Sequence, residues 1–267
     1  MAKIRYIALM TKDPENLAGF YKEYLGMEEL ARSSQGDISL TDSFYNVTLF
    51  RIHDEHREKV EPGLHHLGFE VDDLEAVKTR AKEFCPTREV TEELGGPCYG
   101  ELRITDPNGI PVTLSENGFG VEGECRRFPR IRHVAFATPD PDMTLQSYTQ
   151  VLGLQELPTS LEFLNRGEPN RFAGDGETNF AMHPFPPGCG QDPRPGFNHI
   201  GFLVPNIETV VNQMSRAVKI APRPADRPYA ELRFKDPERN AVDLSQSKGW
   251  EVASGKWERG VGAGAIV

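Results

Sequence analysis

Cysteine is scarce in this sequence, and its placement excludes two classes of stabilising site. The 267 residues contain four cysteines and no Cys-x-x-Cys pair. Neither a disulfide framework nor a cysteine-based zinc site is therefore expected, and a reducing cytoplasm is the expected compartment. The four residues are Cys85, Cys98, Cys125 and Cys189.

Positive charge and long apolar runs are also in short supply. Thirty Lys and Arg residues stand against 40 Asp and Glu residues, which gives a net charge of −10 and a pI near 5.3. Such an acidic chain is poorly suited to nucleic acid or to an anionic membrane surface. No apolar run approaches the roughly 18 residues of a membrane span. With 38% hydrophobic residues, the composition is that of a globular protein.

The sequence repeats itself at an offset of about 130 residues. Residues 99–107 (YGELRITDP) and 229–237 (YAELRFKDP) are identical at six of nine positions. Shorter matches follow in the same order: 4–8 with 131–135, 66–69 with 199–202, 112–115 with 242–245, and Gly118-Phe119 with Gly249-Trp250. The repeat predicts two homologous halves, residues 1–120 and 131–250, joined by a linker at 121–130. Residues 251–267 are predicted to form a glycine-rich tail, either an arm or a disordered end.

Each half contains a smaller unit twice. A predicted strand over residues 4–10 is followed by Asp13 and Pro14, which are typical of the start of a helix, and Gly26 ends that helix. Short strands separated by Gly, Pro and Asn turns come next. The order β-α-β-β-β is predicted four times along the chain.

These units resemble the vicinal oxygen chelate superfamily. The likeness rests on a strand, an Asp-capped helix carrying Phe-Tyr and Leu-Gly, and a late strand that follows Asp-Pro. The superfamily includes glyoxalase I, bleomycin-resistance proteins, epimerases and extradiol ring-cleaving dioxygenases. The resemblance implies an α+β fold of tandem domains, each built from two βαβββ modules that form a curved sheet around a cleft. It does not fix an activity, because the fold supports lyases, isomerases, oxygenases and binding proteins.

In that superfamily, metal ligands lie on the first and last strands of the modules. The corresponding positions of the second half hold His133, His199 and Asp243. Strand alternation places all three on faces lined by small residues, where a metal and a substrate have room. The family usually has Glu where this chain has Asp243, which is one methylene shorter. The alternative is that both histidines are ordinary strand residues and Asp243 caps a turn.

The first half holds Tyr6, His66 and Thr113 at the same positions. One imidazole does not hold a metal, so this half is predicted to be a scaffold, a dimer surface or a degenerate cleft. The neighbouring His65 is expected to face away from His66, because adjacent strand residues point to opposite sides.

Two histidines and one carboxylate suit an open divalent site, with Fe(II) or Mn(II) favoured and Zn(II) or Ni(II) also accommodated. The layout resembles two-domain extradiol dioxygenases, whose triad lies in the C-terminal half. It departs from them in having Arg233 at a position usually held by Tyr, and no His after His199.

Three further residues are candidates for proton transfer or substrate binding: Tyr229, Arg233 and His183. Each has a structural alternative. Tyr229 and Arg233 recur as Tyr99 and Arg103 in the half without a metal triad, which favours a Glu–Arg pair or a turn anchor around Glu231. His183 is matched by His53.

Three functions remain open at this point. The first is a metal-dependent enzyme acting on a small oxygen-chelating substrate by oxygenation, isomerisation or lyase chemistry. The second is a metal-free protein that sequesters a small molecule, as bleomycin-resistance proteins do. The third is a scaffold without small-molecule function. The expected partner is a small-molecule substrate. A homodimer is also possible, with the first half as its contact surface. Neither nucleic acid nor a membrane is expected as a partner.

Overall fold

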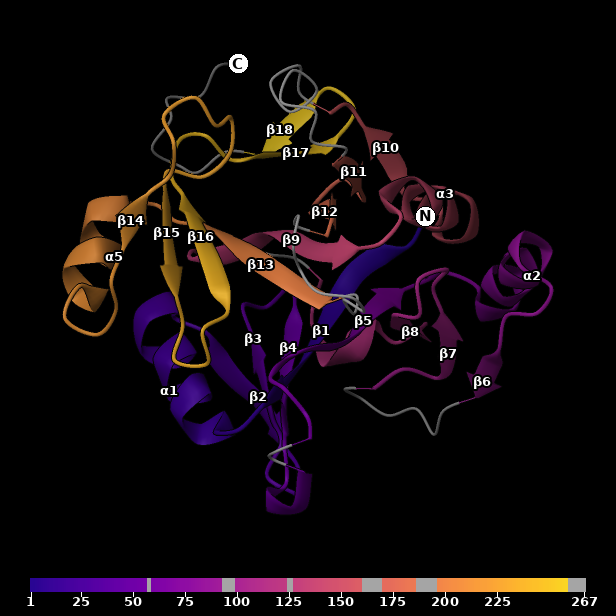
Figure 1. The fold of residues 1–267 in the computed structure, drawn as a ribbon, viewed down its shortest axis with the longest axis horizontal. Coiled ribbons are helices and arrows are strands. Elements are labelled where there is room, and N and C mark those ends of the chain that lie inside the picture. The colour runs from indigo at the N-terminus through magenta and orange to yellow at the C-terminus, as the bar shows by residue number, and fades with distance from the viewer. Residues whose placement is uncertain (57–58, 93–98, 124–126, 160–169, 186–195, 259–267) are drawn as a thin grey trace.

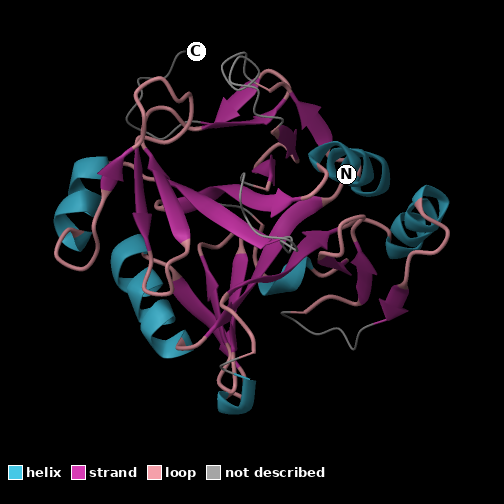
Figure 2. Cartoon of the chain, viewed as in Figure 1, coloured by secondary structure: helices cyan, strands magenta, loops and turns pink. Residues whose placement is uncertain are grey.

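The computed structural model describes residues 1–56, 59–92, 99–123, 127–159, 170–185 and 196–258. Two curved sheets lie against each other, with helices packed along their outer faces (Figures 1 and 2). Cys85 is described as a free thiol, whereas the other three cysteines lie outside the described residues. No helix in the described part of the chain is long and apolar enough to cross a membrane.

The first half contains two βαβββ units, as predicted. Their elements are β1 (Lys3–Thr11), α1 (Pro14–Leu25), β2 (Glu28–Arg32), β3 (Ile38–Thr41), β4 (Asn46–Arg51), η1 (Asp54–His56), β5 (Gly63–Glu70), α2 (Leu74–Phe84), β6 (Val90–Glu92), β7 (Leu102–Thr105), β8 (Pro111–Ser115) and η2 (Gly118–Gly120).

The second half repeats this order and adds a hairpin. Its elements are β9 (Arg130–Thr138), α3 (Pro141–Leu152), β10 (Gln155–Leu157), β11 (Arg171–Gly174), β12 (Asn179–Pro184), β13 (Gly196–Leu203), α5 (Ile207–Met214), β14 (Ala221–Pro222), β15 (Leu232–Lys235), β16 (Ala241–Ser245), β17 (Trp250–Ala253) and β18 (Lys256–Glu258). The predicted fold class, two tandem α+β domains of paired βαβββ modules, is confirmed.

Each half forms one eight-stranded mixed sheet. The strand orders are β2-β3-β4-β1-β5-β8-β7-β6 and β10-β11-β12-β9-β13-β16-β15-β14, which are identical when the repeat is taken into account. The first strands of the two modules pair antiparallel at the centre, and each pairs in parallel with the last strand of its own module. First and last strands therefore lie side by side, which brings the predicted ligand positions together.

The helix ends follow from the sequence. Asp13 caps α1 by accepting a hydrogen bond of 3.0 Å from the Asn16 amide, and Gly26 ends the helix with a φ of 64°. Asp140 caps α3 in the same way, with Gly153 at its end. Glycine suits these two ends because a left-handed conformation costs it little.

One continuous hydrophobic core joins the helix-facing sides of both sheets. Aromatic side chains cross between the halves: Tyr21 of α1 lies 6.4 Å from Phe202 of β13, and Phe69 of β5 lies 6.2 Å from Phe180 of β12, both measured between ring centroids. The opposite, inner faces carry separate small clusters. The sheets thus share one core while each keeps an inner face for a site of its own.

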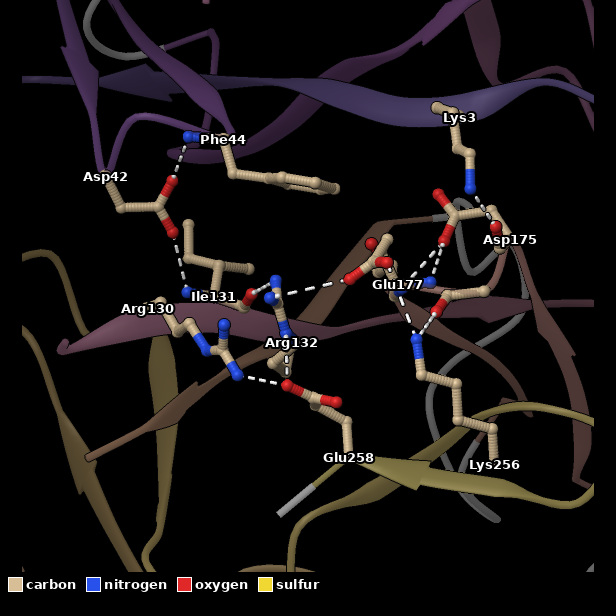
Figure 3. Close-up of polar contacts among 12 residues, drawn as sticks. Lys3, Asp42, Phe44, Arg130, Ile131, Arg132, Asp175, Glu177, Lys256 and Glu258 are labelled. Atoms are coloured by element: carbon tan, nitrogen blue, oxygen red, sulfur yellow. Dashed lines mark hydrogen bonds and ion pairs between the residues drawn. The ribbon is translucent and has the colours of Figure 1, made fainter. Parts of the chain in front are cut away.

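Two aspartates tie the halves together reciprocally. Asp42, in the turn after β3, accepts a 2.7 Å hydrogen bond from the Ile131 amide of β9. Asp175, in the turn after β11, accepts a 2.8 Å hydrogen bond from the Ile4 amide of β1. Each also accepts two backbone amides of its own turn. Figure 3 shows the contact of Asp42 with Ile131, Lys3 donating to the Asp175 backbone carbonyl, and buried Arg132 near Glu177 and Glu258.

The tail differs from its prediction over its first residues. β17 and β18 form a hairpin that contacts β11 and β12, with Trp250 and Val252 buried, so residues 250–258 are neither a free arm nor disordered. Residues 259–267 lie outside the described part. The boundaries at 120 and 131 stay predictions, because one core spans both halves.

Candidate functional site

A small cavity lies on the inner face of the second sheet. Its volume is about 30 Å³, roughly one or two water-sized groups. All three predicted metal ligands line it, together with residues of β11, β12, β17 and the segment after β14. The lining consists of His133, Phe172, His183, His199, Arg223, Arg227, Tyr229, Asp243 and Trp250.

The two predicted histidine ligands face each other across this cavity. His133 is on β9 and His199 on the neighbouring β13, and their Nε2 atoms lie 2.9 Å apart. Both side chains are buried. The strand alternation that predicted a shared face is therefore confirmed for these two residues.

Asparagines fix how the imidazoles present their nitrogens. The Asn179 amide nitrogen donates to the Glu251 carbonyl at 2.6 Å, so the Asn179 oxygen must accept from His133 Nδ1, at 2.7 Å. His199 Nδ1 lies 2.8 Å from the Asn198 side-chain oxygen in the same arrangement. His133 Nε2 then carries a lone pair directed into the cavity. The tautomer of His199 follows from the orientation of the Asn198 amide: its Nε2 either donates to His133 Nε2 or faces it with a second lone pair, which a cation between the two would stabilise.

Asp243 lies beside the histidines but is already paired. On β16, it places Oδ2 3.5 Å from His199 Nε2. The guanidinium of Arg233, from the adjacent β15, grips both of its oxygens, at 2.5 Å from Nε and 2.8 Å from Nη2. Arg223 Nε is 3.9 Å from Oδ2. The bidentate pair between Arg233 and Asp243 holds the carboxylate in one orientation and offsets its negative charge.

The donor set fits a divalent metal through its two imidazoles. Two nitrogen ligands about 2.1 Å from one ion and at roughly a right angle lie about 3 Å apart, which matches the separation of His133 and His199. Asp243 is near enough to be a third ligand, but only while sharing its oxygens with Arg233. In the described part of the chain, no group of three or more His, Cys, Asp or Glu side chains is arranged to hold a metal ion.

Burial and positive charge keep the cavity's histidines neutral. Burial is the main cause that lowers the pKa of His133 to about 4 and that of His183 to about 3, with Arg233 and Arg223 adding repulsion in both cases. The pKa of His199 is lowered well below its usual value, again chiefly by burial and then by His133. All three imidazoles are therefore uncharged near pH 7 and available as bases or ligands.

His183 is the third imidazole of the cavity. Located on β12, it stacks on His199 with 5.7 Å between ring centroids, and its Nδ1 lies 2.8 Å from the Asn170 side-chain oxygen. Its Nε2 is buried and has no hydrogen-bond partner among the described residues. This geometry suits proton transfer in the cavity, whereas His53, its repeat counterpart, is part of no such cluster in the described structure.

The other two candidates have different surroundings. Tyr229 lines the cavity and stacks on Trp257 of β18 with 5.5 Å between ring centroids. The predicted Glu–Arg pair is wrong, because Arg233 turns to Asp243 instead. Glu231 anchors a turn by accepting the backbone amides of residues 246–248, which confirms that alternative.

An aromatic residue that the sequence analysis did not select closes the cavity from behind. Trp250 of β17 stacks on His133 with 5.3 Å between ring centroids and an interplanar angle of 4°. Gly201 of β13 makes room for both, since a Cβ there would lie 2.6 Å from Trp250 Cζ2 and 2.8 Å from His133 Cβ. The repeat match of Gly249-Trp250 with Gly118-Phe119 was the available signal.

The corresponding place in the first half is lined by aromatic side chains. Phe119 of η2 stacks on Tyr6 with 5.0 Å between ring centroids, and His66 lies 5.1 Å from Tyr6. The expectation that His65 faces away from His66 is wrong: their Nδ1 atoms are 2.7 Å apart. A β-bulge between β1 and β5 breaks the alternation here, since Ala8 pairs with His66 and Leu9 with Leu64.

Comparison with known families agrees with this architecture. The sequence matches the Glyoxalase/Bleomycin resistance protein/Dioxygenase superfamily over residues 3–114 and 130–244. The chain belongs to this superfamily. Both halves match it separately, so the duplication inferred from the sequence and the repeated sheet share one origin.

Solved structures show the same fold at low sequence identity. A Mn(II)-bound glyoxalase from Novosphingobium aromaticivorans is 16% identical with a TM-score of 0.71, covering 100% of this chain and 89% of its own. The 2,3-dioxygenase LapB from Pseudomonas sp. KL28 is 16% identical with a TM-score of 0.68 and 91% coverage of both chains. A complex of homoprotocatechuate 2,3-dioxygenase from Brevibacterium fuscum with 3,4-dihydroxyphenylacetate is 18% identical with a TM-score of 0.66, covering 91% and 79%. No curated protein matches the sequence.

Proposed function

We propose that the second half carries a divalent metal site and that the protein is a metal-dependent enzyme acting on a small oxygen-chelating substrate. The ligands are His133, His199 and Asp243. The observation that carries the proposal is the pair of buried imidazoles, with Nε2 atoms 2.9 Å apart and each Nδ1 held by an asparagine oxygen. Such outer hydrogen bonds are how proteins orient histidine ligands.

The residues around the site have distinct roles in this proposal. A bound divalent ion would act as a Lewis acid toward substrate oxygens. His183 Nε2, buried and without a described partner, accepts and returns a proton at the substrate. Arg233 holds the Asp243 carboxylate in one orientation. Trp250 supports the His133 ring and excludes water from its far side.

The ligand types narrow the reaction class. Two histidines and one carboxylate, without a fourth protein ligand, leave open positions for a chelating substrate and a co-reactant. This layout favours the extradiol-dioxygenase type over a four-ligand glyoxalase type, and Fe(II) or Mn(II) over Zn(II) or Ni(II). The name of one structural neighbour, a Mn(II)-bound glyoxalase, supports a divalent metal.

A second function, metal-free binding of a small molecule, is favoured by one observation. Both oxygens of Asp243 already accept hydrogen bonds from Arg233, so the only anionic ligand has a partner without any metal. A protein that only sequesters a small molecule would need no metal ion beside Asp243, because Arg233 already neutralises this carboxylate.

Metal titration of substituted proteins separates the two functions. Full-length protein, purified without a metal-affinity tag and treated with chelator, would be titrated with Mn(II) and the free ion followed by electron paramagnetic resonance. We expect one Mn(II) per chain in the wild type and binding at least about tenfold weaker in Asp243→Asn, which lacks the anionic ligand. Asp243→Glu should retain binding, because it restores the longer side chain usual in the family.

The matched control is Thr113→Asn, at the position of the first half that corresponds to Asp243. It should leave Mn(II) binding unchanged. Absence of stoichiometric Mn(II), Fe(II) or Zn(II) in the wild type, or equal binding in the wild type and Asp243→Asn, would overturn the metal site and leave metal-free binding as the better function.

A further inference from the structure

The cavity of the second half has more positive than negative charge in its walls. Arg223 and Arg227 line it, and Arg233 reaches it through Asp243, which is the only carboxylate among the described lining residues. The nearby Glu231 does not offset this excess, because its carboxylate is turned toward backbone amides of residues 246–248. Three guanidinium groups are therefore set against one carboxylate.

Arg223 is the guanidinium whose position most clearly points to a missing partner. Its backbone amide donates to the Glu231 carbonyl at 2.8 Å, which fixes the residue just after β14. Its Nε is buried and makes no hydrogen bond within the described residues, and the 3.9 Å separation from Asp243 is too long for one. A buried donor of this kind is costly unless something accepts from it.

The rest of the wall is aromatic. Phe172 of β11 lies 5.7 Å from Tyr229 between ring centroids, and Trp250 forms the back of the cavity. Aromatic walls with a few convergent charged groups are typical of sites for small organic molecules. The volume of about 30 Å³ leaves room for the charged head of such a molecule rather than for a large polyanion.

We propose that this cavity binds a small organic acid, whose carboxylate pairs with the guanidinium of Arg223 while Asp243 stays paired with Arg233. This deepens the proposed function, and rests on it, by naming the substrate class as an aromatic or other compact carboxylic acid. A carboxylate matches the planar fork of a guanidinium, and it relieves the repulsion among the three arginines. An uncharged analogue of the same shape gains neither effect.

The test measures anion binding by full-length, metal-free protein, so that it does not depend on the metal. The reporter is the intrinsic fluorescence of Trp250 in the cavity wall, one of only two tryptophans in the chain. The probes are benzoate, the neutral isostere benzamide and inorganic phosphate. We expect benzoate to bind at least about tenfold more tightly than benzamide, because a hydrogen bond between two charged groups is stronger than one to a neutral amide.

Substitution assigns the effect to its residue. Arg223→Gln should weaken benzoate binding by about tenfold or more and leave benzamide binding unchanged. Arg216→Gln, an exposed arginine of the same half, is the matched control and should change neither. Circular dichroism of both variants checks that they are folded.

Three outcomes would overturn the proposal: equal affinity for benzoate and benzamide, no effect of Arg223→Gln, or phosphate binding as tightly as benzoate through Arg223. The last would identify a general oxyanion site. Loss of the metal site in the Mn(II) titration, with benzoate selectivity intact, would remove the proposed enzyme and keep the acid-binding cavity. Stoichiometric Mn(II) binding without benzoate selectivity would leave the proposed enzyme in place and exclude only a carboxylic acid as its substrate class.

Discussion

The two halves of this protein share one sheet topology but differ in the side chains on the inner face of each sheet. In the second half, His133, Gly201 and Trp250 stack against one another beside a cavity. In the first half, the corresponding positions are Tyr6, Gly68 and Phe119, and a Cβ on Gly68 would lie 2.5 Å from Tyr6 Cβ and 2.8 Å from Phe119 Cζ. The packing of an aromatic residue over a glycine is common to both.

The chemistry, in contrast, depends on the residues at the strand positions around that packing. At the three corresponding positions the first half keeps one imidazole, His66, whose pKa burial lowers to about 3, but has Tyr6 and Thr113 where the second half has His133 and Asp243. The packing of an aromatic residue beside a glycine therefore belongs to the fold of both halves, whereas the proposed ligand set depends on the remaining positions.

The largest expected effect is loss of the metal on removal of His133. His133→Ala removes one of only two imidazole ligands, so Mn(II) binding should weaken by at least about 100-fold, measured by electron paramagnetic resonance and elemental analysis. His66→Ala is the counterpart in the first half and should change metal content little. Equal metal loss in both variants would mean that the halves are not functionally different.

A smaller effect is expected from filling the two glycine positions. Gly201→Ala and Gly68→Ala should each destabilise the fold by up to about 3 kcal/mol, because the added methyl group overlaps an aromatic ring and the first strand. Urea denaturation would measure this. Only Gly201→Ala should also weaken Mn(II) binding, since it displaces His133. If Gly201→Ala left metal binding intact at wild-type stability, the proposed support of His133 by Trp250 would be wrong.

The smallest effect is a difference in pH dependence between two matched aspartates. Burial raises the pKa of Asp106 to about 6, and its Oδ1 accepts backbone hydrogen bonds from Asn108 and Ile110. The folded state therefore keeps this proton up to about pH 6, whereas the unfolded chain releases it near pH 4. The stabilisation is complete below pH 4 and is lost as the pH rises through 6. Asp106→Asn should thus be about 1–2 kcal/mol more stable than wild type at pH 8 and equal to it near pH 4.

Burial raises the pKa of the counterpart, Asp236, as well, but its substitution should have the opposite sign because its carboxylate accepts from side-chain donors. Its Oδ2 accepts from the Tyr21 hydroxyl and from the Asn240 side-chain amide, and its Oδ1 from two backbone amides. Asp236→Asn turns an amide donor toward the Asn240 donor and should destabilise the protein by about 1–3 kcal/mol at pH 8. Thermal denaturation of both variants at pH 4.5 and pH 8 would show whether the signs differ.

The sequence predicted the fold and the meeting of the ligands for a simple reason. Repeat spacing, helix caps and strand alternation are local patterns, and parallel pairing of β13 with β16 brings His199 and Asp243 to neighbouring strands without further information. The facing imidazoles of His133 and His199 follow from the same alternation.

The rest depended on features that local patterns do not contain. β-Bulges at His65 and at Asn198 direct residues next to a histidine back onto it, against simple alternation. Arg233 could pair with Glu231 on its own strand or with Asp243 on the neighbouring strand, and only the folded structure shows that it pairs with Asp243. Trp250 reaches the cavity because the chain returns past β16 as a hairpin, which a glycine-rich tail did not predict.

The reciprocal contacts of Asp42 and Asp175 have a consequence for the history and the assembly of the chain. Each aspartate accepts a hydrogen bond from a first-strand amide of the opposite half, so either half taken alone would leave that amide without this partner. A single ancestral half would have met the same need by pairing with a second copy of itself, exchanging these turns across a two-fold axis. Fusion of two copies into one chain then makes that pairing permanent, and it allows the residues of the two inner faces to diverge from each other. Either half expressed by itself should accordingly self-associate, with the exposed strand amide as the point of contact.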